Sequence, residues 1–262
     1  MPIRRIAPSF RERVWGVTTL EPWFPNPQER IGEVWFEPAP EIAAEFPLLV
    51  KFVFTSGKLS VQVHPDDAYA RARHNCLGKT EMWHVLAAEP GAKIAAGFRE
   101  PVTPERLKAS ALSGEIENLL EWHDASAGDT FFIPAGTVHA IGPGLTLCEI
   151  QQNSDITYRL YDYGRPRELH LEDAVKVSRG DRCAPRAVPT GNSLVSCDYF
   201  KVDRLRITSL QQHHPPSGRS QMLIVVEGSG EIDGEAAKAG EAWMVGDPVK
   251  LSGTMTILTA AV

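Results

Sequence analysis

Short apolar runs recur along the chain, and glycine and proline separate them. The runs are rich in β-branched, aromatic and leucine residues, which favour strands. Strands are expected at FPLLVKFVF (46–54), LSVQV (59–63), EMWHVLA (81–87), DTFFI (129–133), LTLCEI (145–150), ITYRLY (156–161), YFKVDRL (199–205), QMLIVVE (221–227), EAWMV (241–245) and TMTILTA (254–260). Many short strands between turn signals predict a mainly β barrel or sandwich rather than an α/β sheet.

Helical signals are few. Thr103 before Pro104 is typical of an N-cap followed by proline in the first turn, and it predicts a helix over 103–112. Ser113 is a candidate cap for a second short helix over 113–120, and residues 170–177 form a third candidate. A few short helices are therefore expected beside the strands.

The domain organisation is predicted from composition and a weak repeat. Residues 181–194 are rich in proline, glycine and polar residues and are expected to link domains 1–180 and 195–262. AGDTFFIPAGTVHAI (127–141) and AGEAWMVGDPVKLSG (239–253) share a glycine-acid-apolar-turn pattern, but the second copy has no histidine. We therefore expect two related β barrels, the second without metal ligands.

Charge and cysteine content limit the classes of binding partner and the cellular compartment that are expected. The chain has 27 basic and 33 acidic residues, a net charge of −6, and no block of Lys or Arg. Nucleic acid and anionic membranes, which need a concentrated basic surface, are therefore not expected as partners. No apolar run predicts a signal peptide or a membrane span, and the four cysteines lack a CxxC pair (Cys76, Cys148, Cys183 and Cys197). A cytoplasmic protein with reduced thiols is expected.

The first candidate metal-binding segment is Leu59–Asp67. In a strand alternate residues share a face, so Ser60, Gln62 and His64 are expected to point together while Val61 and Val63 pack behind them. Pro65 then ends the strand, and the two aspartates that follow are interpreted as turn residues.

Two further segments supply candidate ligands. In GKTEMWH (78–84) the same alternation places Lys79 and Glu81 on one face and turns His84 away, so Glu81 is the expected ligand. The segment 128–139 has the spacing G-x5-P-x-G-x2-H of a cupin motif, in which a tight turn delivers His139 into the barrel. The sequence thus predicts a cupin, a jelly-roll β-barrel.

Gln62, His64, Glu81 and His139 form a nitrogen and oxygen ligand set that suits zinc and leaves room for water or substrate. One carboxylate against a dication leaves Lewis acidity for polarising a carbonyl. The same two histidines and Glu81 also satisfy the facial triad of a non-haem iron oxygenase. The pair His213 and His214 has no third ligand nearby in sequence.

Four motifs resemble one family closely. LSVQVHPDD, GKTEMW, GDTFFIPAGTVHAI and EIQQNSDITYRLYDYGR are similar, in this order, to the short bacterial form of the type I mannose-6-phosphate isomerases. The resemblance covers roughly residues 9–178 and is weak beyond residue 195. The inserted helical domain and the longer early loop of larger members are curtailed here. The resemblance therefore does not predict which part of the chain closes the pocket.

The resemblance implies site residues, position by position. It makes Gln62, His64, Glu81 and His139 the ligands of one zinc ion per chain. Lys79 corresponds to the active-site lysine, Asp155 to an aspartate linked to proton transfer or ring opening, and Glu149 to a residue that lines the site. Arg159 corresponds to the arginine near the reacting carbons, and Ser60 and Arg165 to positions near the substrate phosphate. Among Lys79, Glu149 and Asp155 the proton-shuttling base stays open; a nearby dication would favour the neutral amine of Lys79.

The resemblance also implies an activity: interconversion of mannose 6-phosphate and fructose 6-phosphate through a cis-enediol. Its small-molecule partner is a sugar phosphate, and the protein is expected to be a monomer or a small homo-oligomer. Three alternatives stay open: the iron oxygenase, a non-catalytic cupin that binds a sugar phosphate, and the same chemistry on another sugar, for example in a glucose-6-phosphate isomerase. Lys79 beside Glu81 favours turnover over mere binding.

Overall fold

A computed structural model describes residues 3–183 and 185–262. Strands dominate it, and its helices are short, so the prediction of a mainly β chain with few helices is confirmed. Among these described residues no helix is long and apolar enough to cross a membrane.

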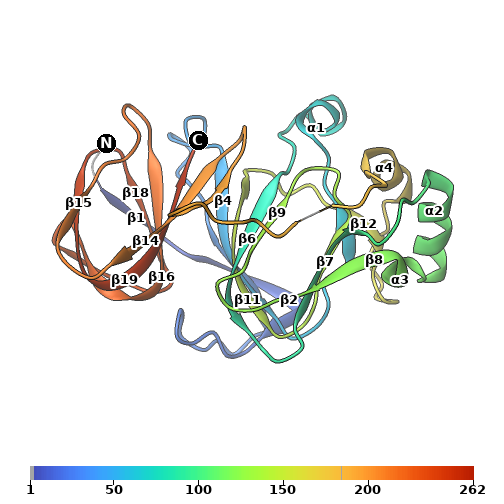
Figure 1. The fold of residues 1–262 in the computed structure, drawn as a ribbon, viewed down its shortest axis with the longest axis horizontal. Coiled ribbons are helices and arrows are strands. Elements are labelled where there is room, and N and C mark those ends of the chain that lie inside the picture. The colour runs from blue at the N-terminus through green and yellow to red at the C-terminus, as the bar shows by residue number, and fades with distance from the viewer. Residues whose placement is uncertain (1–2, 184) are drawn as a thin grey trace. The chain divides into compact units, whose positions relative to one another are not determined.

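The chain forms two compact units (Figure 1). Unit 1 contains the residues up to Arg13, Val17–Val53 and Val188–Val262, and unit 2 contains Val14–Gly16 and Phe54–Ala187. This grouping differs from the predicted boundaries 1–180, 181–194 and 195–262, because the N-terminal strands join the C-terminal ones. The predicted linker is largely irregular, yet part of it is held within unit 2, where Phe132 N donates to Pro185 O and Ala187 N to Thr130 O.

Unit 1 is built mainly on a sheet of order β1-β18-β16-β19-β14-β13, with β15 paired to β19 and β17 to β16. Figure 1 shows the N-terminal strand β1 in blue beside the red C-terminal strands, and Arg5 pairs in register with Trp243 of β18. The bounds are β1 Arg4–Ile6, β13 Ser193–Ser196, β14 Lys201–Ile207, β15 Gln211–His213, β16 Gln221–Ile232, β17 Glu235–Lys238, β18 Glu241–Val245 and β19 Val249–Ala261.

Three early strands pair antiparallel in the order β2-β3-β4. They are β2 Ser9–Val17, β3 Ile31–Phe36 and β4 Leu48–Thr55; Val14–Gly16 of β2 and the last two residues of β4 are counted in unit 2. A separate apolar core lies among the C-terminal strands, around Leu223, Trp243 and Ile257. A register shift between Val225 and Glu227 changes which residues of β16 face that core.

Unit 2 contains two antiparallel sets of strands, of order β12-β5-β10-β7-β8 and β11-β6-β9. The first is β5 Val61–Val63, β7 Lys93–Phe98, β8 Leu120–Asp124, β10 His139–Ile141 and β12 Tyr158–Tyr161, and the second is β6 Glu81–Ala88, β9 Thr130–Ile133 and β11 Leu145–Gln152. The apolar residues on one face of β5, β10 and β12 pack in a core with helix residues, among them Val61, Val63, Ala140 and Leu160.

The four helices in the described part of the chain belong to unit 2: α1 Asp67–His74, α2 Pro104–Ser113, α3 Ile116–Leu119 and α4 Leu171–Val177. Figure 1 shows α2, α3 and α4 gathered beside β12 and β8. Thr103 caps α2 as predicted, because its side chain accepts from Arg106 N. The expectation for Ser113 is wrong: it ends α2, and α3 begins only at Ile116 without a side-chain cap.

Candidate metal centre and active site

Two histidines and one glutamate from separate segments meet inside unit 2. One ligand atom from each of His64, Glu81 and His139 lies within 4.8 Å of the others, and all three side chains are buried. His139 Nε2 lies 3.3 Å from Glu81 Oε1, and His64 Nε2 lies 3.6 Å from the same oxygen. His64 follows β5, Glu81 opens β6 and His139 opens β10, so both sets of strands in unit 2 contribute.

Strand register explains how the neighbouring polar residues reach this point. Gln62 of β5 lies opposite both His139 of β10 and Arg159 of β12, so the three share one face of the sheet. The amide nitrogen of Gln62 lies 3.2 Å from His139 Nε2. For Gln62 to bind a metal through oxygen, its amide would have to turn by half a rotation, which also changes its bond with Ser60.

Backbone carbonyls orient both imidazoles. His64 Nδ1 lies 2.8 Å from Ile156 O, and His139 Nδ1 lies 2.9 Å from Thr137 O. Because a carbonyl only accepts, each Nδ1 carries the proton and each Nε2 keeps its lone pair. These lone pairs point to the space beside Glu81, where His64 Nε2 and Glu81 Oε1 are buried without a hydrogen-bond partner.

Burial and charge set the protonation states. Burial, with help from Lys79, lowers the pKa of His64 to about 3, and burial also lowers the pKa of His139. Burial alone would raise the pKa of Glu81, but Lys79 and the two histidines outweigh it and hold this pKa well below its ordinary value. At neutral pH the cluster therefore presents two neutral imidazoles and a carboxylate, the forms that bind a metal ion.

A buried lysine adjoins the cluster. Lys79 Nζ lies 3.0 Å from Glu81 Oε2 and 3.8 Å from Glu149 Oε1, and its side chain is only 5% exposed. Trp83 completes this side, because its Nε1 donates to Glu149 Oε2 and its ring meets His139 edge to face at 5.3 Å between centroids. The result is a buried chain of alternating charges that runs from Glu149 through Lys79 to Glu81.

The remaining predicted residues lie less centrally. Ser60 is buried and donates to Gln62 Oε1 at 3.3 Å, whereas Asp155 is exposed on the loop before β12. Arg159 Nη1 donates to Glu168 O, while its Nε is buried without a partner. Arg165 is bound to the buried carboxylate of Asp162 at 2.7 Å and to Lys58 O at 2.9 Å.

His84 lies outside the cluster, where its Nδ1 is 2.9 Å from Thr130 Oγ1. The two aspartates after Pro65 lie at the start of α1: Asp66 caps the helix, but Asp67 also accepts from Gly78 N and from Gln152 Nε2. Sequence reasoning did not single out Gln151 or Gln152. For Gln151 a signal existed, since alternation places it on the face of Glu149, and it lies opposite Glu81.

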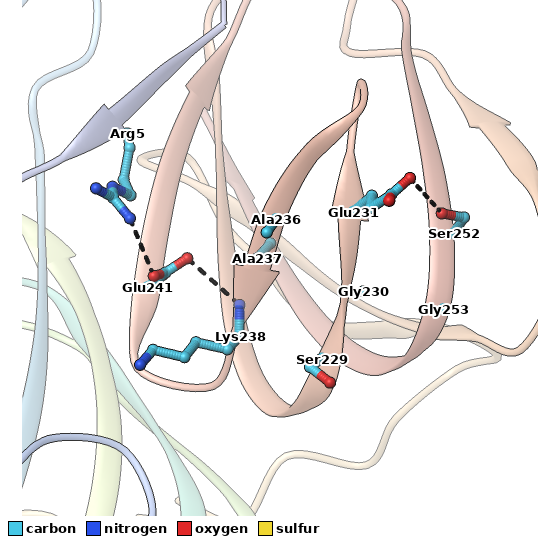
Figure 2. Close-up of a pocket in the computed structure, with 10 residues that line it drawn as sticks. All are labelled: Arg5, Ser229, Gly230, Glu231, Ala236, Ala237, Lys238, Glu241, Ser252 and Gly253. Carbon is cyan, nitrogen blue, oxygen red and sulfur yellow. Dashed lines mark hydrogen bonds and ion pairs between the residues drawn. The ribbon is translucent and has the colours of Figure 1, made fainter.

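Two pockets lie elsewhere in the described structure. One of about 630 Å³ in unit 1 is shown in Figure 2, with a floor of small residues of β16, β17 and β19 and with Arg5, Glu231, Lys238 and Glu241 among its lining residues. Arg5 is paired with Glu241, and no predicted site residue lines this pocket. The other, of about 260 Å³ in unit 2, is lined by Thr137, Arg179 and Arg182 among others.

The curated proteins that this chain resembles include several mannose-6-phosphate isomerases. No protein-family model matches the chain. Mannose-6-phosphate isomerase ManA of Bacillus subtilis is 34% identical to this chain in an alignment that covers 87% of each chain. Mannose-6-phosphate isomerase of Streptococcus mutans is 34% identical to this chain in an alignment that covers 85% of this chain and 84% of the relative.

Solved structures agree. The crystal structure of the mannose 6-phosphate isomerase from Bacillus subtilis matches with a TM-score of 0.87 and 28% identity, over 98% of this chain and 99% of that one. A phosphomannose isomerase variant from Salmonella typhimurium matches with a TM-score of 0.78 at 18% identity, over 99% of each chain, which shows a shared fold. The predicted cupin fold is thereby confirmed. The chain belongs to the mannose-6-phosphate isomerase family.

Proposed function

We propose that this protein is a zinc-dependent mannose-6-phosphate isomerase that interconverts mannose 6-phosphate and fructose 6-phosphate. The observation that carries the proposal is the buried cluster of His64, Glu81 and His139 with Lys79 against it, in a chain of this family. Family membership supports the isomerase chemistry, and the cluster supports its dependence on a metal ion.

The residues fit a zinc ion. Two imidazole Nε2 atoms and one carboxylate are a common ligand set of catalytic zinc, and here both Nδ1 atoms are held by backbone carbonyls, as bound histidines require. The buried, partnerless His64 Nε2 and Glu81 Oε1 would otherwise be costly to keep. Gln62 is the proposed fourth ligand after rotation of its amide.

The reaction needs a proton to leave C2 of the open-chain aldose and to arrive at C1, while O1 gains a proton and O2 loses one. When bound, zinc would stabilise the negative charge that develops on these oxygens. Arg159 is the protein cation proposed to share this task, because it lies on the same sheet face as Gln62 and His139 and its Nε has no partner.

Lys79 and Glu149 are the proposed proton carriers. A base at C2 must accept the proton and return it to C1 on the same face of the cis-enediol. The 3.8 Å separation between Lys79 Nζ and Glu149 Oε1 permits a proton to pass between them, so the two can act as one buried acid-base pair. Asp155 is exposed and is a weaker candidate for this role.

The substrate phosphate is proposed to bind at Ser60 and Arg165. Arg165 is bound to Asp162, which also holds Arg167 through two bonds of 2.6 and 2.7 Å, so the guanidinium of Arg165 is already oriented. A phosphate would share Arg165 with Asp162 rather than meet a free cation.

A coupled assay with mannose 6-phosphate tests the function directly. We expect turnover that is lost on chelation and restored by zinc. Glu81→Ala should remove bound zinc and activity together, because it deletes the carboxylate ligand. Lys79→Met should lower kcat by about 100-fold or more while zinc content stays normal, because it deletes a proton carrier and no ligand.

The same preparations separate the alternatives. Activity in a zinc-free Glu81→Ala protein would contradict the proposal. Oxygen uptake that depends on iron would support the oxygenase. Tight binding of mannose 6-phosphate without turnover by the zinc-loaded protein would support a binding cupin instead.

A further inference from the structure

A buried glutamine outside the ligand cluster connects the segments that carry it. Gln152, at the end of β11, is 3% exposed. Its Oε1 accepts from Thr80 N at 2.9 Å, its Nε2 donates to Asp67 Oδ1 at 2.8 Å, and its backbone N donates to Thr80 O at 3.1 Å. The side-chain amide therefore binds two separate segments at once.

These bonds continue into all three metal-binding motifs. Asp67 Oδ1 also accepts from Gly78 N at 2.8 Å, and Lys79 N donates to Pro65 O at 3.0 Å, so the segment before β6 lies against the segment after His64. Thr80 Oγ1 accepts from Ala135 N at 3.1 Å, in the turn that delivers His139. Thr80, bound by Gln152, lies between Lys79 and Glu81 in the chain.

The pairing of β11 with β6 ends one residue before Gln152. The last register pair of β11 and β6 joins Gln151 to Glu81, and the pairing of β6 with β9 also begins at Glu81. The backbone at Gly78 packs closely against the start of α1, since a Cβ on Gly78 would lie 2.5 Å from Asp67 N. Without the side chain of Gln152, Thr80 N would be buried without this acceptor, beside the residues whose placement matters most.

We propose that Gln152 is a positioning residue that fixes Glu81 and Lys79 relative to His64. Its side-chain amide is bound to Thr80 and Asp67, and it acts through these two residues. The role in catalysis rests on the proposed function, whereas the role in holding Glu81 is measurable by metal binding alone.

The test compares Gln152→Met with Gln221→Met in the full-length zinc protein. Methionine keeps the length of the side chain and removes both hydrogen bonds. Gln221 is a matched control, because it is also buried and bonded, to His213 at 2.7 Å, but lies in unit 1. Gln152→Met should weaken zinc binding, measured by competition with a chelator, by about 10-fold or more. In zinc-saturated protein it should lower kcat more than it raises KM.

Asp67→Ala is the second variant, which keeps the bond to Thr80 N and should weaken zinc binding less. If Gln152→Met does not fold, the zinc affinity of Asp67→Ala is the deciding measurement. The inference would be overturned if Gln152→Met, or Asp67→Ala where Gln152→Met does not fold, binds zinc within twofold of the parent affinity. An equal loss of zinc affinity in Gln221→Met would also overturn it. If the parent does not isomerise mannose 6-phosphate but Gln152→Met still weakens zinc binding selectively, the proposed function fails and the role of Gln152 in holding Glu81 stands.

Discussion

The buried imidazole of His64 makes the stability of the metal-free protein sensitive to acid. Its pKa in the folded chain is about 3, against 6.5 for an ordinary histidine. As the pH falls below 6.5, the unfolded chain binds a proton that the folded site does not accept, so stability is lost between these two values. The depressed pKa of Glu81 acts in the same direction, because its carboxylate is stabilised only while ionised.

We therefore expect the free energy of unfolding of the metal-free protein to decrease from pH 6.5 toward pH 4.5. His64→Asn should reduce the slope by up to about 1.4 kcal/mol per pH unit, because it removes one titrating group. Urea unfolding at several pH values measures this. His214→Asn, at an exposed position, is the control and should keep the parent slope. An unchanged slope in His64→Asn would show that the pKa of this imidazole does not differ between the folded and the unfolded protein.

At the residue scale, strand alternation predicts faces well because its period is local. It placed Gln62 and His64 on one face and His84 on another, and the structure has them so. Loop and strand-end residues follow no such period. Arg165 is bound to Asp162, three positions earlier in an irregular segment, and Gln152 acts on Thr80, 72 positions earlier, so strand alternation predicts neither contact.

At the scale of elements, the turn between β9 and β10 sets the position of His139. Gly136 has a φ of +86° in this turn, its N donates to His64 O, and its O accepts from Arg179 N. A Cβ at this position would lie 2.9 Å from Val177 O. The glycine of the cupin spacing is thus required both by the left-handed backbone and by the close approach of neighbouring chain.

Gly136→Ala should therefore lower both the unfolding temperature and the zinc content, because relief of the contact moves the turn. Gly128→Ala is a matched control: its φ is +90°, yet a Cβ there meets nothing within 4 Å. It should cost about 1 to 3 kcal/mol of stability from backbone strain and leave zinc content normal. Calorimetry with metal analysis measures both. Equal zinc loss in the two variants would mean that strain alone, and not the contact, disturbs the site.

The type of most elements could be predicted from sequence, but their partners could not. Periodicity tells which side of a strand is apolar, and it does not tell which strand lies beside it. The pairing of β1 with β18 therefore had no local signal: no strand was predicted before residue 46, and compact unit 1 groups these residues with the C-terminal strands. The short helix α3 was expected to begin three residues too early, since Ser113 lies in α2 and the actual N-cap, Glu115, forms no side-chain bond.

At the scale of the whole molecule, the proposed metal ligands belong to one compact unit. His64, Glu81 and His139 all lie within Phe54–Ala187, and Gln152 and Lys79, which adjoin them, do too. A bound ion stabilises only those conformations in which its ligands are together, so it raises the free energy of every opening that separates them. Openings that leave the site intact gain nothing from the ion.

Hydrogen exchange of zinc-loaded and metal-free protein tests whether the two units open separately. We expect zinc to slow amide exchange in β5, β6 and β10, and to leave exchange in β16 and β19 of unit 1 unchanged. Glu81→Ala mixed with the same concentration of zinc is the control: it should bind no ion, so zinc should not slow exchange in β5, β6 or β10. If zinc slows β16 and β19 as much as β6, the openings that expose those strands must also break the metal site. The two units would then unfold as one cooperative structure, and substitutions in unit 1 should weaken zinc binding as well.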